Sequence, residues 1–233
     1  MEKQTLTIEQ KRLDIDIWII VLVTLGSFVI YTITGNQLMN FVKNSDVSVI
    51  PRLLLNATVQ FGVAGMGISL VCILRKERFS KFGLKTKNSG KAIIGTVLCF
   101  VPIIGYIFAS GQFSGYQPFS TILVIKDMLS AGAPVSIIGM VIIIVVWGFE
   151  GFNYVVICYK INKRYPSTNQ WLDYGAITCA IVCILFHPIS FSFWGIVQII
   201  TTFAAIYGML IVKKITGNAW GCIFAFLFIW NAI

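Results

Sequence analysis

The sequence predicts an all-α membrane protein, a polytopic bundle of about seven transmembrane helices, from its composition and its long apolar runs. Of the 233 residues, 57% are hydrophobic and 12% are charged, and the mean hydropathy is +0.85. Soluble domains carry about 25% charged residues, so this chain has too few polar side chains to cover a water-soluble core. The composition excludes a soluble enzyme, a secreted disulfide scaffold and a disordered tail. The apolar runs are continuous rather than alternating, which favours helices over a β-barrel.

Seven apolar stretches are long enough, or nearly so, to cross a hydrocarbon core about 30 Å thick. The fifth and the seventh are short, and we expect them to use flanking residues or to lie within the bundle. Residues 1–16 carry mixed charges and no small-residue cleavage site, so they are predicted to form a cytoplasmic head before a single transmembrane domain, residues 17–233. The seven stretches are residues 17–34, 53–74, 92–109, 135–159, 172–187, 191–212 and 219–233.

The distribution of Lys and Arg predicts the orientation. Fifteen of the 18 basic residues lie in the head and in the connections 75–91, 160–171 and 213–218. The positive-inside rule therefore places the N-terminus in the cytoplasm and the C-terminus outside, in a multi-pass protein of the cell membrane. The net charge of +9 thus reports topology. Nucleic acid is not an expected partner, because no basic stretch carries a folded surface that could contact bases.

Two connections have further interpretations. The basic connection 75–91 is predicted to be a solvated loop attracted to anionic membrane lipids. In the outer connection 110–134, Gly and Pro interrupt apolar residues around Lys126 and Asp127. This segment is either a short interfacial helix or a lid over a cavity.

Polar side chains inside the predicted spans are rare, and ionisable groups in membranes are usually functional. Glu150 lies in the fourth stretch, His187 (the only histidine) closes the fifth, and Asn231 lies near the end of the seventh. Their positions along the helices permit them to converge in the bundle. A carboxylate beside an imidazole can deprotonate a water, and an amide can stabilise an oxyanion. The alternative is a polar network that only fixes helix packing.

Three neighbouring residues belong to the same candidate site. Asn153 and Tyr154 follow Glu150 by three and four positions, so they lie on its side of a helix and could orient it. Cys183 lies four residues before His187, on the same helix face. No metal and no other cofactor are expected, because one Glu, one His and at most one Cys make a poor zinc site.

At these residues the chain resembles the CAAX protease and bacteriocin-processing family, intramembrane proteases also called abortive-infection proteins. The family pattern is E-E-x-x-x-R, then F-x-x-x-H, then H-x-x-x-N, each on its own helix. Glu150, His187 and Asn231 stand in the matching order, and the turn at residues 216–218 is similar to one that precedes the third motif. The resemblance covers about residues 75–233. It implies that Glu150 and His187 activate a water while Asn231 stabilises the oxyanion.

The chain also departs from the family pattern. If Glu150 is instead the second Glu of the first motif, Phe149 replaces the first Glu and Tyr154 replaces the Arg. With Glu150 as the first Glu, the departures are Gly151 for the second Glu, Val155 for the Arg, Cys183 for the Phe of the second motif and Leu227 for the His of the third.

The resemblance predicts an intramembrane endopeptidase that cleaves a hydrophobic or prenylated peptide, or a bacteriocin precursor, among membrane lipids. Loss of one oxyanion donor typically slows an enzyme by about 10²–10³. Two alternatives stay open: a catalytically inactive relative that binds a peptide or bacteriocin, in self-immunity or membrane signalling, and a small-molecule transporter. No internal repeat supports the transporter.

Overall fold

The computed structural model describes residues 6–169, 171–187 and 190–232, and every regular element within these ranges is a helix. Four helices are long and apolar enough to cross a membrane: α1 (Ile8–Lys43), α4 (Ser89–Ala109), α6 (Ala133–Arg164) and α8 (Phe193–Thr216). Helices α2 (Val49–Ala64) and α3 (Met66–Arg75) count as a fifth span if they are taken together, although they are bent by 61°. The all-α prediction is therefore confirmed for the described residues, with four to five candidate spans.

The fifth and seventh predicted stretches form helices that are too short to count as spans. Helix α7 (Tyr174–Leu185) has 12 residues, and α9 (Trp220–Ala225) continues into a π-helical turn, η2 (Phe226–Trp230). Seven full spans are thus not confirmed. Both short helices pack among the long ones, α7 against α6 and α8, and α9 against α4 and α6.

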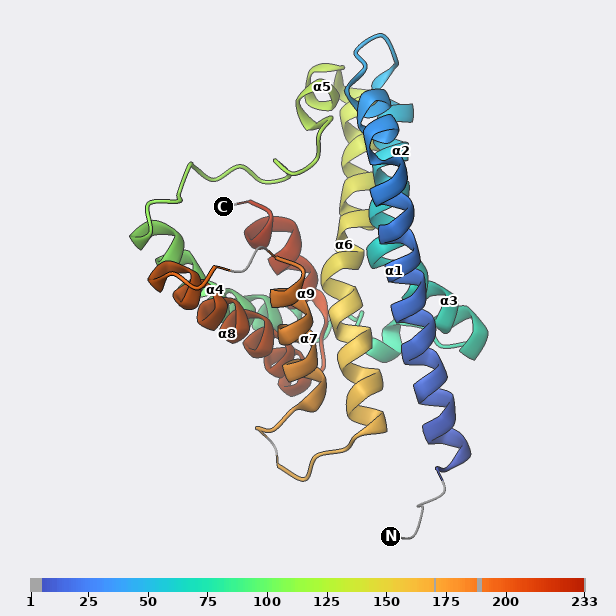
Figure 1. The fold of residues 1–233 in the computed structure, drawn as a ribbon, viewed down its shortest axis with the longest axis vertical. Helices are drawn as coiled ribbons and strands as arrows, with labels where there is room; N and C mark the ends of the chain where they lie inside the picture. The colour runs from blue at the N-terminus through green and yellow to red at the C-terminus, as the bar shows by residue number, and fades with distance from the viewer. Residues whose placement is uncertain (1–5, 170, 188–189, 233) are drawn as a thin grey trace.

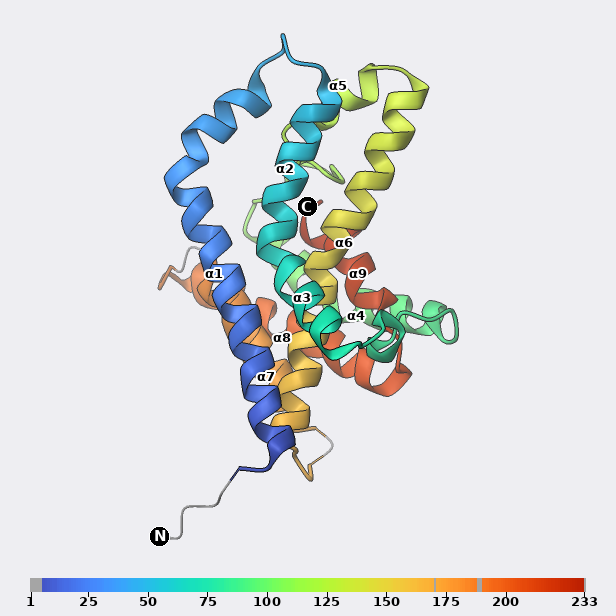
Figure 2. The ribbon, with the colours of Figure 1, turned by 90° about the vertical axis from the view of Figure 1, so that its right-hand side faces the viewer.

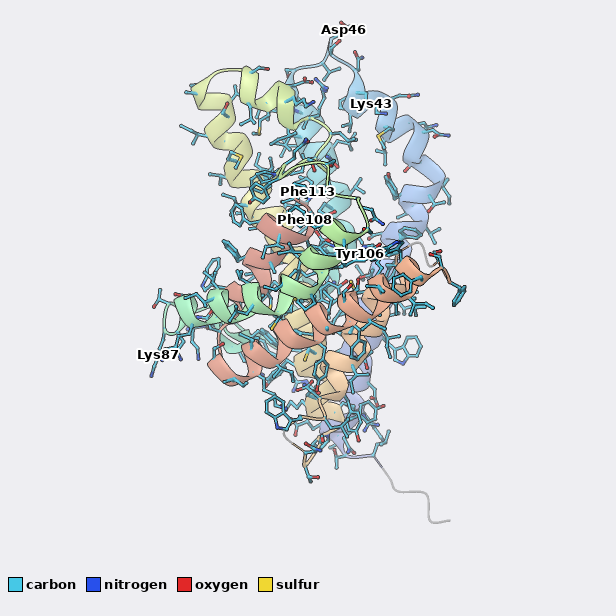
Figure 3. All side chains as sticks on the ribbon, turned by 90° about the vertical axis from the view of Figure 1, so that its left-hand side faces the viewer. Lys43, Asp46, Lys87, Tyr106, Phe108 and Phe113 are labelled. Carbon is cyan, nitrogen blue, oxygen red and sulfur yellow. The ribbon has the colours of Figure 1, made fainter. Side chains whose placement is uncertain are left out.

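The long helices form two groups. Helices α1, α2 and α6 run along the long axis of the molecule (Figures 1 and 2). Helices α4 and α8 pack against each other and cross that axis, as the course of α4 toward Tyr106 shows in Figure 3. Helices α7 and α9 connect the groups, so the last helical turns of the chain lie near the middle of the molecule (Figure 1).

Capping residues set where the helices begin and end. The Thr7 hydroxyl accepts a hydrogen bond from the Gln10 backbone N–H, and the Gln10 side chain accepts one from the Thr7 backbone N–H. This capping box starts α1 at Ile8, so the second half of the predicted head belongs to the first helix. Asp173 caps α7 through its side chain alone, which accepts a hydrogen bond from the Ala176 backbone N–H. Gly217 ends α8 in the left-handed conformation, with φ of +64°, which favours glycine.

The connection between α4 and α6 contains a short helix, as one of its two predicted interpretations expects, while a position at the membrane interface and a role as a lid stay predictions. The short helix is α5 (Ile125–Ser130), which the Arg52–Asp127 ion pair (2.7 Å) links to α2. The preceding residues cross the end of η2, where the Gln117 backbone N–H donates to the Ala232 carbonyl oxygen at 2.8 Å. This segment therefore covers the end of the chain that carries Asn231.

Candidate functional site

Glu150 lies on α6 where α2 and the last turn of the chain approach it. The Gln60 side-chain amide donates a hydrogen bond to Glu150 Oε2 at 3.2 Å, and the Asn231 amide donates to the same oxygen at 3.1 Å. Asn231 Nδ2 also donates to the Phe226 carbonyl oxygen at 3.1 Å. The π-helical turn η2 thus fixes the amide that holds the carboxylate, and π-helical turns are frequent at functional sites.

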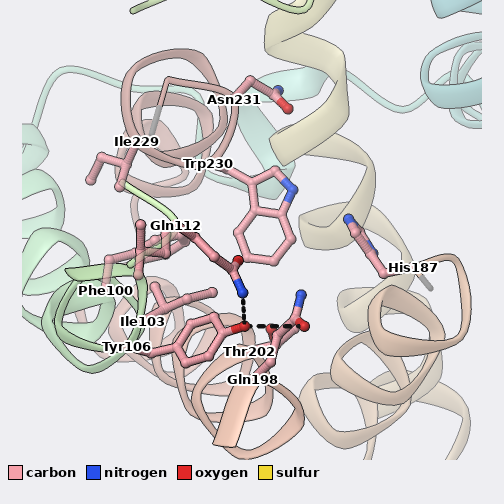
Figure 4. A pocket seen from close by; sticks show the side chains of 11 residues that line it. Phe100, Ile103, Tyr106, Gln112, His187, Gln198, Thr202, Ile229, Trp230 and Asn231 are labelled. Atoms are coloured by element: carbon pink, nitrogen blue, oxygen red, sulfur yellow. Dashed lines mark hydrogen bonds between the residues drawn. The ribbon is translucent and has the colours of Figure 1, made fainter. Parts of the chain in front are cut away.

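A cavity of about 280 Å³ lies beside Asn231 and is lined by residues of α4, α8 and the last turn (Figure 4). His187 and Trp230 line it together with Asn231. Two linked hydrogen bonds lie along one side of the cavity. Gln112 Nε2 donates to the Tyr106 hydroxyl at 2.8 Å, and that hydroxyl donates to Gln198 Oε1 at 3.4 Å. The cavity therefore combines aromatic walls with amide and hydroxyl groups, as pockets for peptides and other small ligands do.

His187 stands at the exposed rim of this cavity. Its Nδ1 lies 2.7 Å from the Cys183 carbonyl oxygen, and its ring meets the Trp230 indole edge-on at 5.3 Å. Because a carbonyl oxygen only accepts hydrogen bonds, Nδ1 carries the proton and Nε2 of the neutral ring can accept one. The contacts of the described residues connect His187 to Glu150 through the cavity and Asn231, not by a direct hydrogen bond.

The other three predicted site residues, Tyr154, Cys183 and Asn153, differ in their contacts. The Tyr154 ring stacks on Phe226 at 5.2 Å, and its hydroxyl neighbours the thiol of Cys183. Both groups lie within electrostatic range of Glu150. Asn153 does not hydrogen-bond Glu150, and its Oδ1 is buried without a hydrogen-bond partner among the described residues. The structure thus brings Glu150, Asn231, Tyr154 and Cys183 together.

Sequence reasoning missed Gln60, the second donor to Glu150. A signal was present in the spacing, because Arg52, Asn56 and Gln60 recur every four residues in an apolar stretch and so share one side of α2. Arg52 is buried and pairs with Asp127, while Asn56 Nδ2 is buried without a partner among the described residues. A search for amides as well as ionisable groups would have found this row.

Close packing accounts for the departures from the family pattern. A Cβ atom at Gly151 would lie 2.3 Å from the Cys222 carbonyl oxygen of α9, so no second Glu fits there. Val155 and Leu227, at the positions of the Arg and the third-motif His, are both buried apolar side chains. The contact between α6 and the last helical turns is thus closely packed and apolar at these three positions.

Among the described residues, no group of three or more His, Cys, Asp and Glu side chains could hold a metal ion. Comparison of the chain with models of protein families, with curated proteins and with solved structures found no significant match. The family resemblance accordingly rests on the residues named above and remains a prediction.

Proposed function

We propose that the protein is an intramembrane endopeptidase of the CAAX protease and bacteriocin-processing type, with Glu150 as general base. The observation that carries the proposal is the 3.1 Å hydrogen bond from Asn231 to Glu150. It joins two residues 81 positions apart, both singled out by the sequence pattern, and one of them, Asn231, lines the cavity that His187 also lines. A polar network that only fixed helix packing would not need a cavity beside it that an imidazole also lines.

In this mechanism a water in the cavity lies between Glu150 and His187. Glu150 removes its proton as the oxygen attacks the scissile carbonyl, and then returns that proton to the leaving amine. His187 Nε2 accepts a hydrogen bond from the water and orients it. Asn231 Nδ2 already donates to Glu150 and to the Phe226 carbonyl. In the resting state it is therefore a positioning residue, and it stabilises the oxyanion only after releasing one of these acceptors.

The proposed substrate is a hydrophobic or prenylated peptide, or a bacteriocin precursor, that enters from the membrane. We also propose that α7 and α9 are embedded in the bilayer together with the longer helices, so that all seven predicted segments lie in the cell membrane. Water, substrate and catalytic groups then meet at a site enclosed by protein rather than by lipid, as buried polar residues in membranes require.

Cleavage of a quenched fluorogenic peptide with a farnesylated cysteine, by protein in liposomes, tests the proposal. We expect Glu150→Gln to lower the rate about 10²–10⁴-fold, the usual contribution of a general base. His187→Ala should lower it as well, with both variants still folded. Asp46→Asn is the matched control, since it converts an exposed acid outside the site to its amide. Cleavage that survives in both site variants would contradict a catalytic role.

A binding protein without catalysis is the second candidate function. It is favoured by the present partners of Asn231, both of which lie within the protein, and by the apolar Leu227 at the place of the second oxyanion donor. In that case the wild type does not cleave the peptide, and Glu150→Gln leaves its affinity for the peptide unchanged. Equilibrium binding of the same fluorescent peptide measures this affinity.

A further inference from the structure

A second cavity, of about 600 Å³, lies where the first turns of α1, the end of α3 and the last turns of α6 meet. Charged side chains form most of its lining: seven are basic and three are acidic. The start of α1 and the end of α6 lie at the same end of the molecule (Figures 1 and 2), away from the cavity beside Asn231. This basic cavity is thus separate from the candidate peptidase site.

All three acidic groups of the basic cavity are already compensated by basic neighbours. Lys160 is only 1% exposed and donates to two carboxylates at once. Four of the seven basic side chains form ion pairs with these acids. The pairs are Asp16 with Arg75 (2.6 Å) and Lys160 (2.8 Å), Glu77 with Lys81 (2.7 Å) and Lys160 (2.6 Å), and Glu9 with Lys163 (2.6 Å).

The other three basic side chains, Arg12, Lys76 and Arg78, are exposed and form no salt bridge among the described residues. Lys76 ends α3 in the left-handed conformation, with φ of +54°, and the backbone there holds the chain in a tight turn. Three uncompensated positive charges on one cavity repel one another unless an anion joins them. Arg and Lys side chains in such an arrangement are typical of phosphate recognition.

Exposed aromatic side chains at this end of the molecule are typical of a membrane surface. Trp18 on α1 is 62% exposed and Trp171, after α6, is 68% exposed. Tyr165, next to the end of α6, is also exposed. Exposed Trp and Tyr are enriched where the bilayer meets water. The excess of Lys and Arg at this end predicts the cytoplasmic leaflet, which is rich in anionic lipids.

We infer that the basic cavity binds the phosphate group of an anionic phospholipid. Arg12, Lys76 and Arg78 contact the phosphate oxygens, while the buried Asp16–Lys160–Glu77 cluster fixes the helices that carry them. The acyl chains extend along the apolar surface of α1, where Trp18 is exposed. The inference is independent of the proposed peptidase activity, because no residue of the candidate site takes part.

Native mass spectrometry of the full chain in detergent, titrated with phosphatidylglycerol or phosphatidylcholine, tests the inference. The wild type should retain phosphatidylglycerol preferentially. The triple variant Arg12→Gln, Lys76→Gln, Arg78→Gln should bind it about 100-fold more weakly, since each charge near an anionic lipid contributes about fivefold. All three side chains are exposed, so the variant should elute and melt like the wild type.

A matched triple variant, Lys85→Gln, Lys87→Gln, Lys91→Gln, removes three exposed charges from the same predicted side of the membrane without touching the basic cavity. It should keep the affinity for phosphatidylglycerol within about twofold, given that no cavity contact is lost. Equal weakening in both triple variants would show a general attraction to the surface and overturn the inference. Displacement of the lipid by inorganic phosphate would identify a site for free phosphate and overturn the lipid assignment.

Discussion

Two polar regions of this molecule differ in how a carboxylate is held. In the cluster of Asp16, Lys160 and Glu77, each acid contacts basic side chains. At the candidate site, Glu150 accepts hydrogen bonds from two neutral amides, those of Gln60 and Asn231. The cluster thereby fixes α1 and α6 to the turn after α3, with its charges balanced. The amides position Glu150 without neutralising it, which is the arrangement that proton transfer requires.

Of the variants that test this comparison, we expect Lys160→Met to have the largest effect on stability. Lys160→Met leaves the buried Asp16 and the half-buried Glu77 with one basic partner fewer each, and breaking a buried pair such as Lys160–Asp16 typically costs about 3–5 kcal/mol. The free energy of unfolding, measured by SDS titration in mixed micelles, should fall by that amount. Lys163→Gln on the same helix removes only an exposed partner of Glu9 and should cause no measurable change. Equal stability of both variants would mean that the cluster does not hold the helices together.

The next effect concerns the packing that positions Asn231. Gly151→Ala places a methyl group against the α9 backbone, 2.3 Å from the Cys222 carbonyl oxygen, and overpacking of this kind costs about 1–3 kcal/mol. Helix α9 must move, so the contact between Asn231 and Glu150 should be lost, and the proposed peptidase activity should fall with it. Gly148→Ala, one turn earlier on α6, meets only the Ile223 side chain at 3.4 Å. It should leave activity and stability near the wild-type values, which makes it the matched control.

Much of the fold could be predicted because the hydropathy of a segment is known from its own residues, without knowledge of the rest of the fold. The predicted stretches 92–109, 135–159, 172–187 and 191–212 correspond to helices α4, α6, α7 and α8. A run of apolar residues in a membrane must form its backbone hydrogen bonds within one segment, which favours a helix. The bend between α2 and α3 could not be predicted in this way. It occurs at Gly65, where a Cβ atom would lie 3.0 Å from the Phe149 ring of α6, a contact that depends on the folded arrangement of the helices.

The candidate site was predictable only in part. Glu150, His187 and Asn231 stand out because polar residues are rare in apolar stretches. The depths of their helices permitted a meeting, but only the folded chain gives Asn231 contact with Glu150. The role of Gly151 depends on the approach of α9, which is encoded some 70 residues later. The charged cluster could not be predicted either, because Asp16 belongs to the predicted head and Lys160 to the distant connection 160–171, although the two side chains lie 2.8 Å apart.

A smaller effect is expected when Glu150 keeps its shape and loses its charge. Glu150→Gln retains an oxygen that can accept from Gln60 and Asn231, so the free energy of unfolding should change by less than about 1 kcal/mol. Glu150→Leu removes that acceptor and leaves two amides unpaired, which costs about 1–3 kcal/mol. The same SDS titration measures both variants. A large loss in Glu150→Gln would show that the charge itself stabilises the fold, as it does in the Lys160 cluster.

The smallest effect is the response of the charged cluster to acid. Burial alone would raise the pKa of Glu77, but the hydrogen bonds from Lys160 and Lys81 outweigh it and hold the pKa below its ordinary value of 4.5. A carboxyl with a lowered pKa stabilises the fold fully above the pKa of the unfolded chain, and this contribution is lost as the pH falls through the folded value. The free energy of unfolding should therefore decline below about pH 4.5, and less steeply in Glu77→Gln than in the wild type. Asp46→Asn, at an exposed position outside the cluster, should keep the wild-type slope. If Glu77→Gln also keeps that slope, Glu77 is not the group whose charge Lys160 compensates, and the contrast with Glu150 would then rest on Asp16 alone.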